Sequence, residues 1–402
     1  MAVGFVNFTV KQLVELDACT RCGECVKWCQ AYREKGDELT APSVKVRELK
    51  ALLKGEHGIP LLSRLLGGRK MTLEQLADFA AGAYRCTLCA RCVAVCPVGI
   101  SLRDLWLSTR EELVARGLHP AGLNLARDAV KQRHNVVNYP NEERATWVDY
   151  MLEAPEDAYQ RRTAEVVYFV GCIASFSPAV QSIPEAFVRL LDKVGVDFTI
   201  LGEREHCCGF PLLAAGMREE AGVAREHNIR MVRQVGAKTV VFTCPSCYNT
   251  WMNDYSSSLP DVELIHSTQL LARLIEEGRL RLKDTSLRIT YHDPCDLGRN
   301  SGEFEAPRRV LRRVPGASFV EIGYNRDKGL CCGGGGDLEI ADPELAGGEA
   351  TRTLEAFEAT GADVVVTACQ QCKRMLQTAR EKRGSVVGIL DIAELILRAS
   401  EG

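Results

Sequence analysis

The latter part of the chain alternates short apolar runs with longer amphipathic stretches. Runs rich in β-branched residues, separated by segments with apolar positions at helical spacing, predict strands connected by helices. The predicted elements are strand Val166–Gly171, helix Ser182–Val194, strand Asp197–Leu201, helix Met217–Val235, strands Thr239–Thr243 and Val262–Ile265, and a helix from Thr268. The same order starts again at Arg288. We therefore expect an α/β fold built twice, each copy a parallel sheet with helices on its faces.

A helical pattern without such runs precedes this part. Residues 43–83 contain SVKVRELKALLKGEHG and MTLEQLADFAAGAY, whose apolar positions recur at helical spacing. They predict an all-α N-terminal domain, with a leucine core of Leu61, Leu62, Leu65 and Leu66. A charged helical connector follows, with Trp106 and Trp147 at its margins. The predicted domains are 1–110 (helical), 111–163 (connector), 164–284 (first α/β copy) and 285–402 (second α/β copy).

Composition excludes several classes of protein. The chain has 402 residues, of which 46% are hydrophobic and 26% charged, as in ordinary globular proteins. A net charge of -3 argues against a nucleic-acid partner. No apolar run approaches the roughly 20 residues that a membrane helix needs, and the first residues lack a secretory signal. We expect a cytoplasmic protein that reaches the inner face of the cell membrane through a partner.

The 18 cysteines divide into four sets with none left over. Two sets have the spacing CxxCxxCxxxC: Cys19, Cys22, Cys25 and Cys29, and Cys86, Cys89, Cys92 and Cys96. In two-cluster ferredoxins this spacing puts three ligands on one 4Fe–4S cubane and the fourth on its neighbour. The sequence therefore predicts two crossed clusters, one on Cys19, Cys22, Cys25 and Cys96, the other on Cys86, Cys89, Cys92 and Cys29.

Zinc and disulfides are the alternatives for these thiols. Zinc sites prefer two pairs of ligands at longer separation, and disulfides are rare in a reducing compartment. Iron–sulfur clusters are therefore favoured. Pro97 follows the last ligand as the ferredoxin pattern expects, whereas Gln30 follows Cys29, a departure that removes no ligand. The helices between the two sets resemble the all-α ferredoxin domains of succinate dehydrogenase iron–sulfur subunits.

The two longer cysteine sets are copies of one another. They are Cys172, Cys207, Cys208, Cys244 and Cys247, and Cys295, Cys331, Cys332, Cys369 and Cys372. EVVYFVGC matches LRITYHDPC, AKTVVFTCPSC matches ADVVVTACQQC, and IHSTQLLARLI matches LDIAELILRAS, which indicates a duplicated unit. Because the cysteines follow predicted strands, they should gather at the carboxyl edge of each sheet, where open α/β sheets build their sites.

Each copy has five thiols, one more than a cubane needs. A cubane with a spare cysteine and a more open cluster that uses all five both remain open. Gly209 and Gly333 directly follow the Cys-Cys pairs and would let the backbone pass close to a cluster, so we count them as cofactor-binding. The run Gly333–Gly336 is a poor phosphate loop, because no GxxxxGK follows.

CysCysGly followed by CysxxCys, present twice, resembles the cysteine-rich CCG domain of heterodisulfide reductase. Joined to a two-cluster ferredoxin, it resembles the D-subunit family of heterodisulfide reductase, and at least as closely the K subunit of the sulfite-reduction-associated membrane complex, whose N-terminal set is similar to DACTRCGECVKWC. The resemblance implies a non-cubane 4Fe–4S cluster on the five cysteines of each copy. Four clusters, two cubane and two non-cubane, are therefore expected.

Two functions remain open at this point. The first is a thiol–disulfide oxidoreductase subunit of anaerobic respiration, in which two clusters facing one cleft reduce or form a disulfide or trisulfide, coupled to a membrane cytochrome b and quinone. The second is an electron-transfer subunit that links a flavoprotein dehydrogenase of the glycolate, lactate, glycerol-3-phosphate or ETF type to the quinone pool. Relatives of the second kind often lack ligands in one copy, whereas both sets are complete here.

Two histidines are candidates for proton transfer. His206 directly precedes the first Cys-Cys pair, and His292 lies just before Cys295. A histidine beside a cluster can deliver a proton to a departing thiolate, so we predict both as catalytic. Tuning of the cluster potential by a hydrogen bond, or capping of the strand end, are the alternatives.

Overall fold

The structure, a computed structural model, describes residues 8–57, 63 and 67–401. These residues divide into two units. Unit 1 contains the described residues up to Leu125 together with Pro211–Arg218 and Gly333–Glu349. Unit 2 contains Ala126–Phe210, Glu219–Cys332 and the described residues from Ala350 onward. The predicted leucine core at Leu61, Leu62, Leu65 and Leu66 lies outside the described residues.

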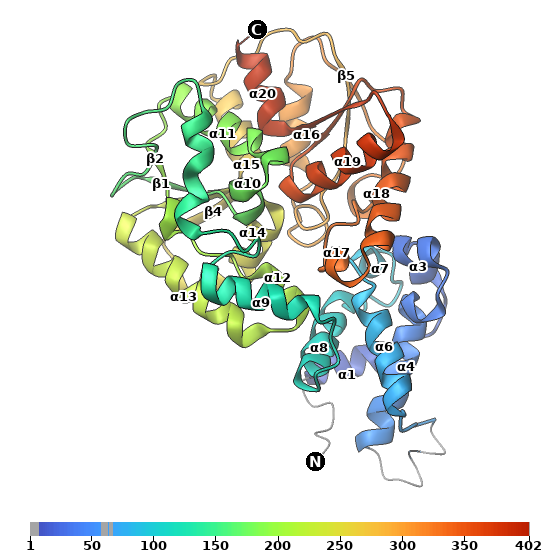
Figure 1. The fold of residues 1–402 in the computed structure, drawn as a ribbon. Coiled ribbons are helices and arrows are strands. Elements are labelled where there is room, and N and C mark those ends of the chain that lie inside the picture. The colour runs from blue at the N-terminus through green and yellow to red at the C-terminus, as the bar shows by residue number, and fades with distance from the viewer. Residues whose placement is uncertain (1–7, 58–62, 64–66, 402) are drawn as a thin grey trace. The chain divides into compact units, whose positions relative to one another are not determined.

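Unit 1 is helical, and its described residues contain no strand. The helices that lie wholly within its main segment are α1 (Val10–Asp17), α2 (Glu24–Lys27), α3 (Gln30–Lys35), η1 (Glu38–Thr40), α4 (Pro42–His57), α6 (Leu73–Tyr84), α7 (Arg91–Ala94) and α8 (Leu102–Ala115) (Figure 1). The short helix α17 (Leu338–Ala341) also belongs to this unit. The prediction of an all-α N-terminal part is confirmed.

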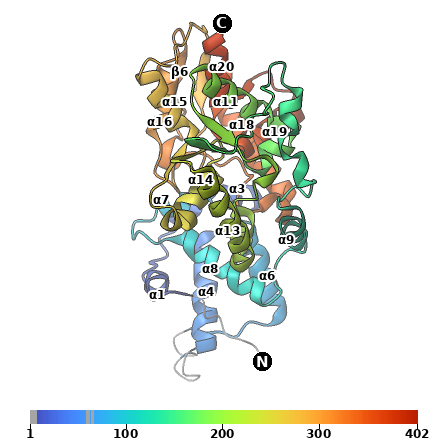
Figure 2. The ribbon, with the colours of Figure 1, turned by 90° about the vertical axis from the view of Figure 1, so that its left-hand side faces the viewer.

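Local sequence explains where these helices begin. Thr9 and Gln12 form a capping box at α1, and Thr72 and Gln75 form another at α6, so the first free N–H groups of each helix are satisfied by side chains. Helix α6 buries an apolar face that includes Phe79 and packs on α4 and α8 (Figure 2). This packing holds the segments that carry the two short-spaced cysteine sets.

Unit 2 contains two four-stranded sheets in which every pairing is parallel. The first half has the order β2-β1-β3-β4, with β1 (Val166–Phe169), β2 (Phe198–Ile200), β3 (Thr239–Phe242) and β4 (Glu263–His266). The second half has the order β6-β5-β7-β8, with β5 (Arg288–Tyr291), β6 (Ser318–Val320), β7 (Val364–Thr367) and β8 (Gly388–Asp391). The duplicated α/β fold is therefore confirmed, and each predicted strand of the first half matches an observed one.

Helices cover the sheets of unit 2 and join its halves. They include α10 (Cys172–Phe176), α11 (Ser182–Lys193), α13 (Arg218–Val235), α14 (Pro245–Thr250), α15 (Ser267–Glu276), α16 (Glu305–Arg312), α18 (Pro343–Glu358), α19 (Gln370–Arg383) and α20 (Ile392–Glu401), of which α13 and α18 begin in unit 1. Helix α11 of the first half packs against α20 of the second, and α15 packs against α16. The two halves therefore share one continuous core.

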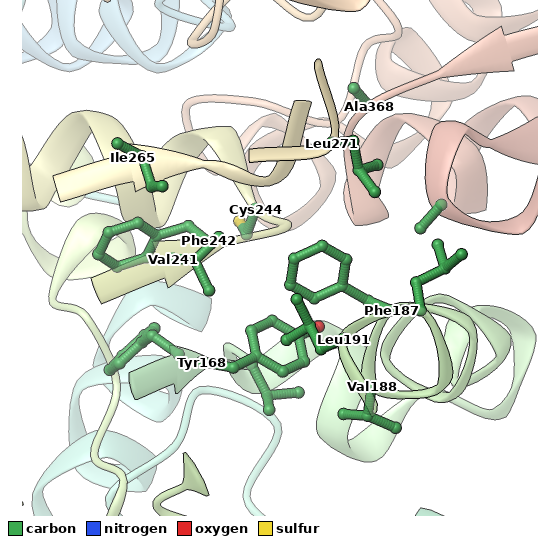
Figure 3. Close-up of a cluster of buried hydrophobic side chains, with 14 of the residues drawn as sticks. Tyr168, Phe187, Val188, Leu191, Val241, Phe242, Cys244, Ile265, Leu271 and Ala368 are labelled. Atoms are coloured by element: carbon green, nitrogen blue, oxygen red, sulfur yellow. The ribbon is translucent and has the colours of Figure 1, made fainter. Parts of the chain in front are cut away.

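The core of unit 2 reaches the cysteines directly. Tyr168 of β1 packs against Phe187 of α11 with ring centroids 4.9 Å apart, and Cys244, two residues after Phe242 of β3, belongs to the same buried cluster (Figure 3). Ala368, which precedes Cys369, belongs to the same cluster. Both tryptophans at the margins of the predicted connector are also buried, Trp106 at 1% exposure and Trp147 at 0%. Among the described residues, no helix is long and apolar enough to cross a membrane.

Candidate metal centres

The two short-spaced cysteine sets lie in loops of unit 1 that share one backbone shape. Arg21 and Gly23 have positive φ angles of 59° and 81°, and Leu88 and Ala90 have 54° and 58° at the matching places of the second loop. Positive φ is costly for leucine, so the surrounding structure must enforce it. Left-handed residues within such loops turn successive N–H groups to one side and form a nest that favours an anion, as at many iron–sulfur sites. The loops therefore fit clusters ligated by thiolates.

The fourth cysteine of each set lies with the other set. Burial raises the pKa of Cys25 to about 11, and three neighbouring thiols add to the rise: those of Cys19, Cys22 and Cys96. Burial also raises the pKa of Cys92, and the thiols that add to it are those of Cys86, Cys89 and Cys29. The structure thus brings together the two crossed groups that the spacing predicts. Because their raised pKa keeps Cys25 and Cys92 protonated at neutral pH, cluster binding by these two thiols must release protons.

Their role as cluster ligands stays a prediction. Within the described part of the chain, no three His, Cys, Asp or Glu side chains surround a point that a single metal ion could occupy. A cubane does not require such a point, because each of its ligands binds a different iron.

The first longer set gathers at the topological switch point of its sheet. Cys172 follows β1 and Cys244 follows β3, and these neighbouring strands are the place where the strand order reverses. Open α/β sheets bind their ligands in that crevice. The thiols form a chain of hydrogen bonds that runs in the order Cys172, Cys207, Cys208, Cys247 and Cys244. Hydrogen bonds from Cys207 and Cys247 lower the pKa of Cys208 to about 6, so one thiolate is already favoured there.

A buried cation lies against this set. The guanidinium of Arg144 is 2% exposed, pairs with Glu205 at 2.8 Å and lies 3.7 Å from the Cys172 sulfur. Glu205 also accepts hydrogen bonds from the backbone N–H groups of Val170 and Gly171, both at 2.9 Å. The hydrogen bond with Cys207 and burial raise the pKa of the Cys172 thiol, and the positive charge of Arg144 offsets part of that rise. Sequence reasoning missed Arg144, because it stands in an ordinary charged helical stretch far from any cysteine motif.

The second longer set repeats the arrangement. Cys295 follows β5, and Cys369 follows β7 and caps α19, where its sulfur accepts from the N–H of Cys372 at 3.4 Å. The pKa of Cys369 lies at about 11: the hydrogen bond with Cys372 lowers it, but burial and the charges of Cys244 and Cys332 outweigh that effect. Cys244 belongs to the first set, so the two sets are close enough to influence one another.

Side chains next to the cysteines join the two sets. Gln370, fully buried and adjacent to Cys369, donates to the carbonyl oxygen of Val170 at 2.7 Å and to the Thr243 hydroxyl at 2.9 Å. Its oxygen accepts from the N–H of Ala174 at 3.2 Å. Gln370 of the second half therefore braces the loops that carry Cys172 and Cys244 of the first.

A reciprocal contact runs the other way. Ser246, which lies between Cys244 and Cys247, donates to the carboxylate of Asp296 at 2.6 Å, and Asp296 directly follows Cys295. Asn249 donates to the carbonyl oxygen of Asn300 at 2.7 Å. Each CysxxCys loop thus holds the cysteine loop of the opposite half.

The requirement for glycine after each Cys-Cys pair has a steric explanation that involves protein atoms. Gly209 and Gly333 have φ angles of 90° and 81°. A Cβ at Gly209 would lie 3.2 Å from that of Ala221, and one at Gly333 would lie 2.3 Å from the carbonyl oxygen of Ala346. Cofactor contact by either glycine stays a prediction. In unit 1, Gly336 approaches the carbonyl oxygen of Cys86, where a Cβ would lie at 2.5 Å, so this glycine passes a cysteine loop.

The predicted catalytic histidines both lie beside the sets. His206 is stacked between His134 and His227, with ring centroids 3.8 Å and 3.4 Å away. Burial, followed by the two neighbouring rings, lowers the pKa of His206 to about 3. A neutral imidazole at pH 7 is a poor general acid, so the geometry favours a positioning role.

His292 is fully buried, and both ring nitrogens are engaged. Nδ1 lies 3.2 Å from the Thr367 hydroxyl and Nε2 lies 3.2 Å from the carbonyl oxygen of Leu330. Burial lowers its pKa as well. These bonds tie β5 to β7 and to the segment before Cys331, which suits a structural role. Catalysis by either histidine stays a prediction.

Lys373, which directly follows the last cysteine, lies on the buried side of α19. It is 2% exposed, and its ammonium pairs with Glu394 at 2.8 Å and with the Ser182 hydroxyl at 2.9 Å. Ser182 belongs to the first half, so this lysine is another contact that holds the halves together.

Comparison with known proteins bears on the whole chain. A family model described as a 4Fe-4S dicluster domain matches residues 15–100, and one described as a cysteine-rich domain, CCG, matches residues 166–251 and again 289–377. The matches cover every cysteine set described above.

Several curated proteins are similar over nearly the full length. The D subunit of dihydromethanophenazine:CoB–CoM heterodisulfide reductase from Methanosarcina barkeri is 38% identical over 98% of this chain and 96% of that protein. Its counterpart from Methanosarcina mazei is 36% identical with the same coverage. The EtfAB:quinone oxidoreductase of Syntrophomonas wolfei is 28% identical; the match covers 98% of this chain and 60% of that protein.

Proposed function

The chain belongs to the D-subunit family of heterodisulfide reductase and is an iron–sulfur oxidoreductase subunit, and from that premise we propose that it reduces or forms a disulfide or trisulfide at the paired cysteine sets of unit 2. The proposal assigns a cubane cluster to each crossed group of unit 1 and a non-cubane cluster to the five cysteines of each half of unit 2. Each iron–sulfur cluster supplies or accepts one electron at a time.

The observation that carries the proposal is the pair of reciprocal contacts between the two sets, in which Gln370 of the second half and Ser246 of the first each donate a hydrogen bond to the cysteine loop of the opposite half; we call these contacts the brace. Reduction of a disulfide takes two electrons and two protons and yields two thiols. A single one-electron site would have to release a sulfur radical between steps, whereas two adjoining sites can each serve one sulfur. The brace therefore supports two sets that act as one pair.

Residues of the chain have separate tasks in this scheme. The five cysteines of each half hold the redox group, and Arg144 stabilises the thiolate of Cys172. Burial excludes water around the sulfurs, since Cys207 and Cys331 are only 1% and 2% exposed. His206 and His292, both neutral at pH 7 because burial lowers their pKa, are the candidates for moving protons to the product thiolates, and the assay below tests that role against a positioning one.

A second candidate function is supported by the similarity to EtfAB:quinone oxidoreductase. In that function the chain passes electrons between a flavoprotein dehydrogenase and quinone without any sulfur chemistry. Two complete cysteine sets favour the first function, because a simple conduit does not need a matched pair of sites.

Partner subunits follow from the family, since the similar proteins are subunits of reductases. We propose a membrane cytochrome b, or a flavoprotein in the second function, as the electron partner. Through it the protein would lie peripherally at the inner face of the cell membrane.

The test is an anaerobic reaction with sulfur substrates. The cluster-replete protein is reduced and mixed with a panel of disulfides and trisulfides, while cluster reoxidation and thiol release are recorded. For every two electrons lost by the clusters, we expect two thiols from a disulfide, or one thiol and one hydropersulfide from a trisulfide. Reoxidation by a flavoprotein or a quinone analogue, with no thiol released from any member of the panel, would contradict the proposal and favour the conduit.

The histidines are tested in the same assay. If they donate protons, His206→Ala and His292→Ala lower thiol release while cluster reduction stays unchanged. Unaltered turnover in both variants would remove proton delivery from their roles.

A further inference from the structure

A basic cavity lies in unit 1 beside the first cysteine loop. It has a volume of about 310 Å³, and its charged lining consists of Arg21, Arg47, Glu48, Lys50, Lys54 and Arg69. Helix α4 supplies four of these residues, and the cysteine loop itself supplies Arg21. Five bases and one acid therefore face the same space.

Local carboxylates offset only part of this positive charge. Glu48, of which 12% is exposed, pairs with both Arg47 and Arg69. Asp17 pairs with Lys50, and the pKa of its carboxyl is lowered by the hydrogen bond with Lys50 and by the charges of Lys50 and Lys54. Even with Asp17 included, five positive charges stand against two negative ones. The cavity is therefore a place where an anionic group gains free energy.

The cavity is lined by Arg21, the residue directly before the most accessible cysteine of the chain. Cys22 alone among the 18 cysteines, all of which the structure describes, is exposed. Arg21 stands directly before it, in a left-handed conformation that the loop enforces. Electron exchange with another protein is fastest where the redox group comes nearest to the surface, so this loop is the natural point of contact.

Offsetting the negative charge of a cluster is the simpler explanation of these bases. That explanation does not account for the exposure of these bases, since the side chains of Arg47 and Arg69 are 48% and 50% exposed. Water and salt screen exposed charges, so such groups do little to offset the charge of a neighbouring cluster. Exposed bases around a concave surface are better suited to an external anion.

We propose that this cavity docks the acidic surface of a protein that exchanges electrons with the cluster at Cys19, Cys22, Cys25 and Cys96. The inference rests on the proposed function for that cluster. Carboxylates of the partner enter the basic cavity and bring its redox group next to Cys22. Complementary charge of this kind steers association and raises the rate of productive encounter.

The experiment compares two electron-transfer proteins of opposite charge as probes. Rates of electron exchange with an acidic flavodoxin and with a basic cytochrome c are measured by anaerobic stopped flow over a range of salt. We expect the flavodoxin rate to fall as salt rises, and to fall about tenfold in the Arg21→Glu/Lys54→Glu variant at low salt. The cytochrome c rate should rise in that variant.

A matched control changes the net charge by the same amount elsewhere. Lys131→Glu/Lys238→Glu replaces two bases that are 54% and 77% exposed and do not line the cavity, so the flavodoxin rate should stay near that of the wild type. Arg21→Gln/Lys54→Gln serves as a milder variant should the double reversal prevent folding, and it should give a smaller loss. Equal flavodoxin rates in the cavity variants and the wild type would overturn the proposal.

Cluster content and thiol release are measured on every variant. Absence of a cluster signal in the wild-type ferredoxin unit would be a failure of the proposed function. A normal signal and normal thiol release, with no dependence on the cavity, would be a failure of the docking proposal alone. Binding of orthophosphate to the cavity without any effect on the flavodoxin rate would reassign it as a small-anion site and would also overturn the proposal.

Discussion

The two halves of unit 2 share a strand order and a cysteine pattern but differ in the charges buried beside the cysteines. In the first half, Arg144 lies 3.7 Å from the Cys172 sulfur and is paired with one carboxylate, Glu205. In the second, the fully buried Arg308 is paired with two carboxylates, Asp293 at 2.7 Å and Glu321 at 2.6 Å. The first half therefore applies a positive charge to a cysteine, whereas the charge of Arg308 is neutralised by acids.

This difference shows which features a duplicated fold retains. Hydrophobic alternation and cysteine spacing set the backbone and must be kept for each half to fold. Buried ion pairs can diverge, because each needs only a partner that neutralises it locally. We therefore expect the two sites to be unequal, with electrons more stable on the first.

Loss of a ligand from either half should have the largest effect. Cys207→Ser and Cys331→Ser should each abolish thiol release, because the two-electron reaction needs both sites. The spectroscopic signal of the intact half should persist in each variant, as recorded by electron paramagnetic resonance. Retained turnover in either variant would break the idea of a paired site.

Removal of the buried cations should separate stability from redox tuning. Arg144→Met leaves Glu205 buried and unpaired, and Arg308→Met does the same to Asp293, so each should cost about 3–5 kcal/mol in the free energy of unfolding. Arg144→Met alone should lower the reduction potential of its own half. Urea denaturation and redox titration measure the two effects. Equal potential shifts in both variants would show that the halves are tuned alike.

The brace should act across the halves. Gln370→Leu leaves the carbonyl oxygen of Val170 without this donor and removes one hydrogen bond from the Thr243 hydroxyl, which keeps its bond to the Tyr168 hydroxyl at 2.8 Å. The loss should cost about 1–3 kcal/mol. In this variant the spectroscopic signature of the first-half cluster should change, although Gln370 stands next to the cysteines of the second half. Gln371→Leu, at the neighbouring and less buried position, removes a hydrogen bond from Arg374 within the second half, so it is the control and should leave the first-half signature unchanged. A change confined to the second half would contradict the brace.

The pH dependence of the free energy of unfolding should have opposite signs for the side chains at the ends of two equivalent strands. His266 ends β4 and Asp391 ends β8, and both are buried. Burial lowers the pKa of His266 to about 3, so its stabilising contribution is lost as pH falls from about 6.5 towards 3. Burial raises the pKa of Asp391 from its ordinary 3.8 to about 8, so its contribution is lost as pH rises through that window.

Two asparagine variants isolate these slopes. His266→Asn keeps a helix cap and should remove about 1.4 kcal/mol per pH unit of acid destabilisation, and Asp391→Asn should remove a similar amount of alkaline destabilisation. Urea midpoints between pH 4 and 9 provide the measurement. If both sites changed the free energy of unfolding with pH in the same direction, the conclusion that His266 and Asp391 are both neutral in the folded protein would be refuted.

Sequence reasoning recovered the elements of the fold with small errors at their ends. The strand expected over Val166–Gly171 ends at Phe169, and the helix expected over Ser182–Val194 ends at Lys193. The apolar periodicity of each element is local information, so these elements could be predicted one at a time. The carboxyl-edge placement of the cysteines followed from the parallel order and was confirmed.

The sequence by itself determined the four cysteine sets, the duplication and the helical N-terminal part, because spacing and periodicity act between near neighbours in the chain. Only the tertiary structure revealed Arg144 against Cys172, the Gln370 brace and the stack of His134, His206 and His227. It also showed that Gly333 is required by the carbonyl oxygen of Ala346. These contacts join residues that are distant in sequence and carry no motif, and buried charges and close approaches arise only when the elements pack.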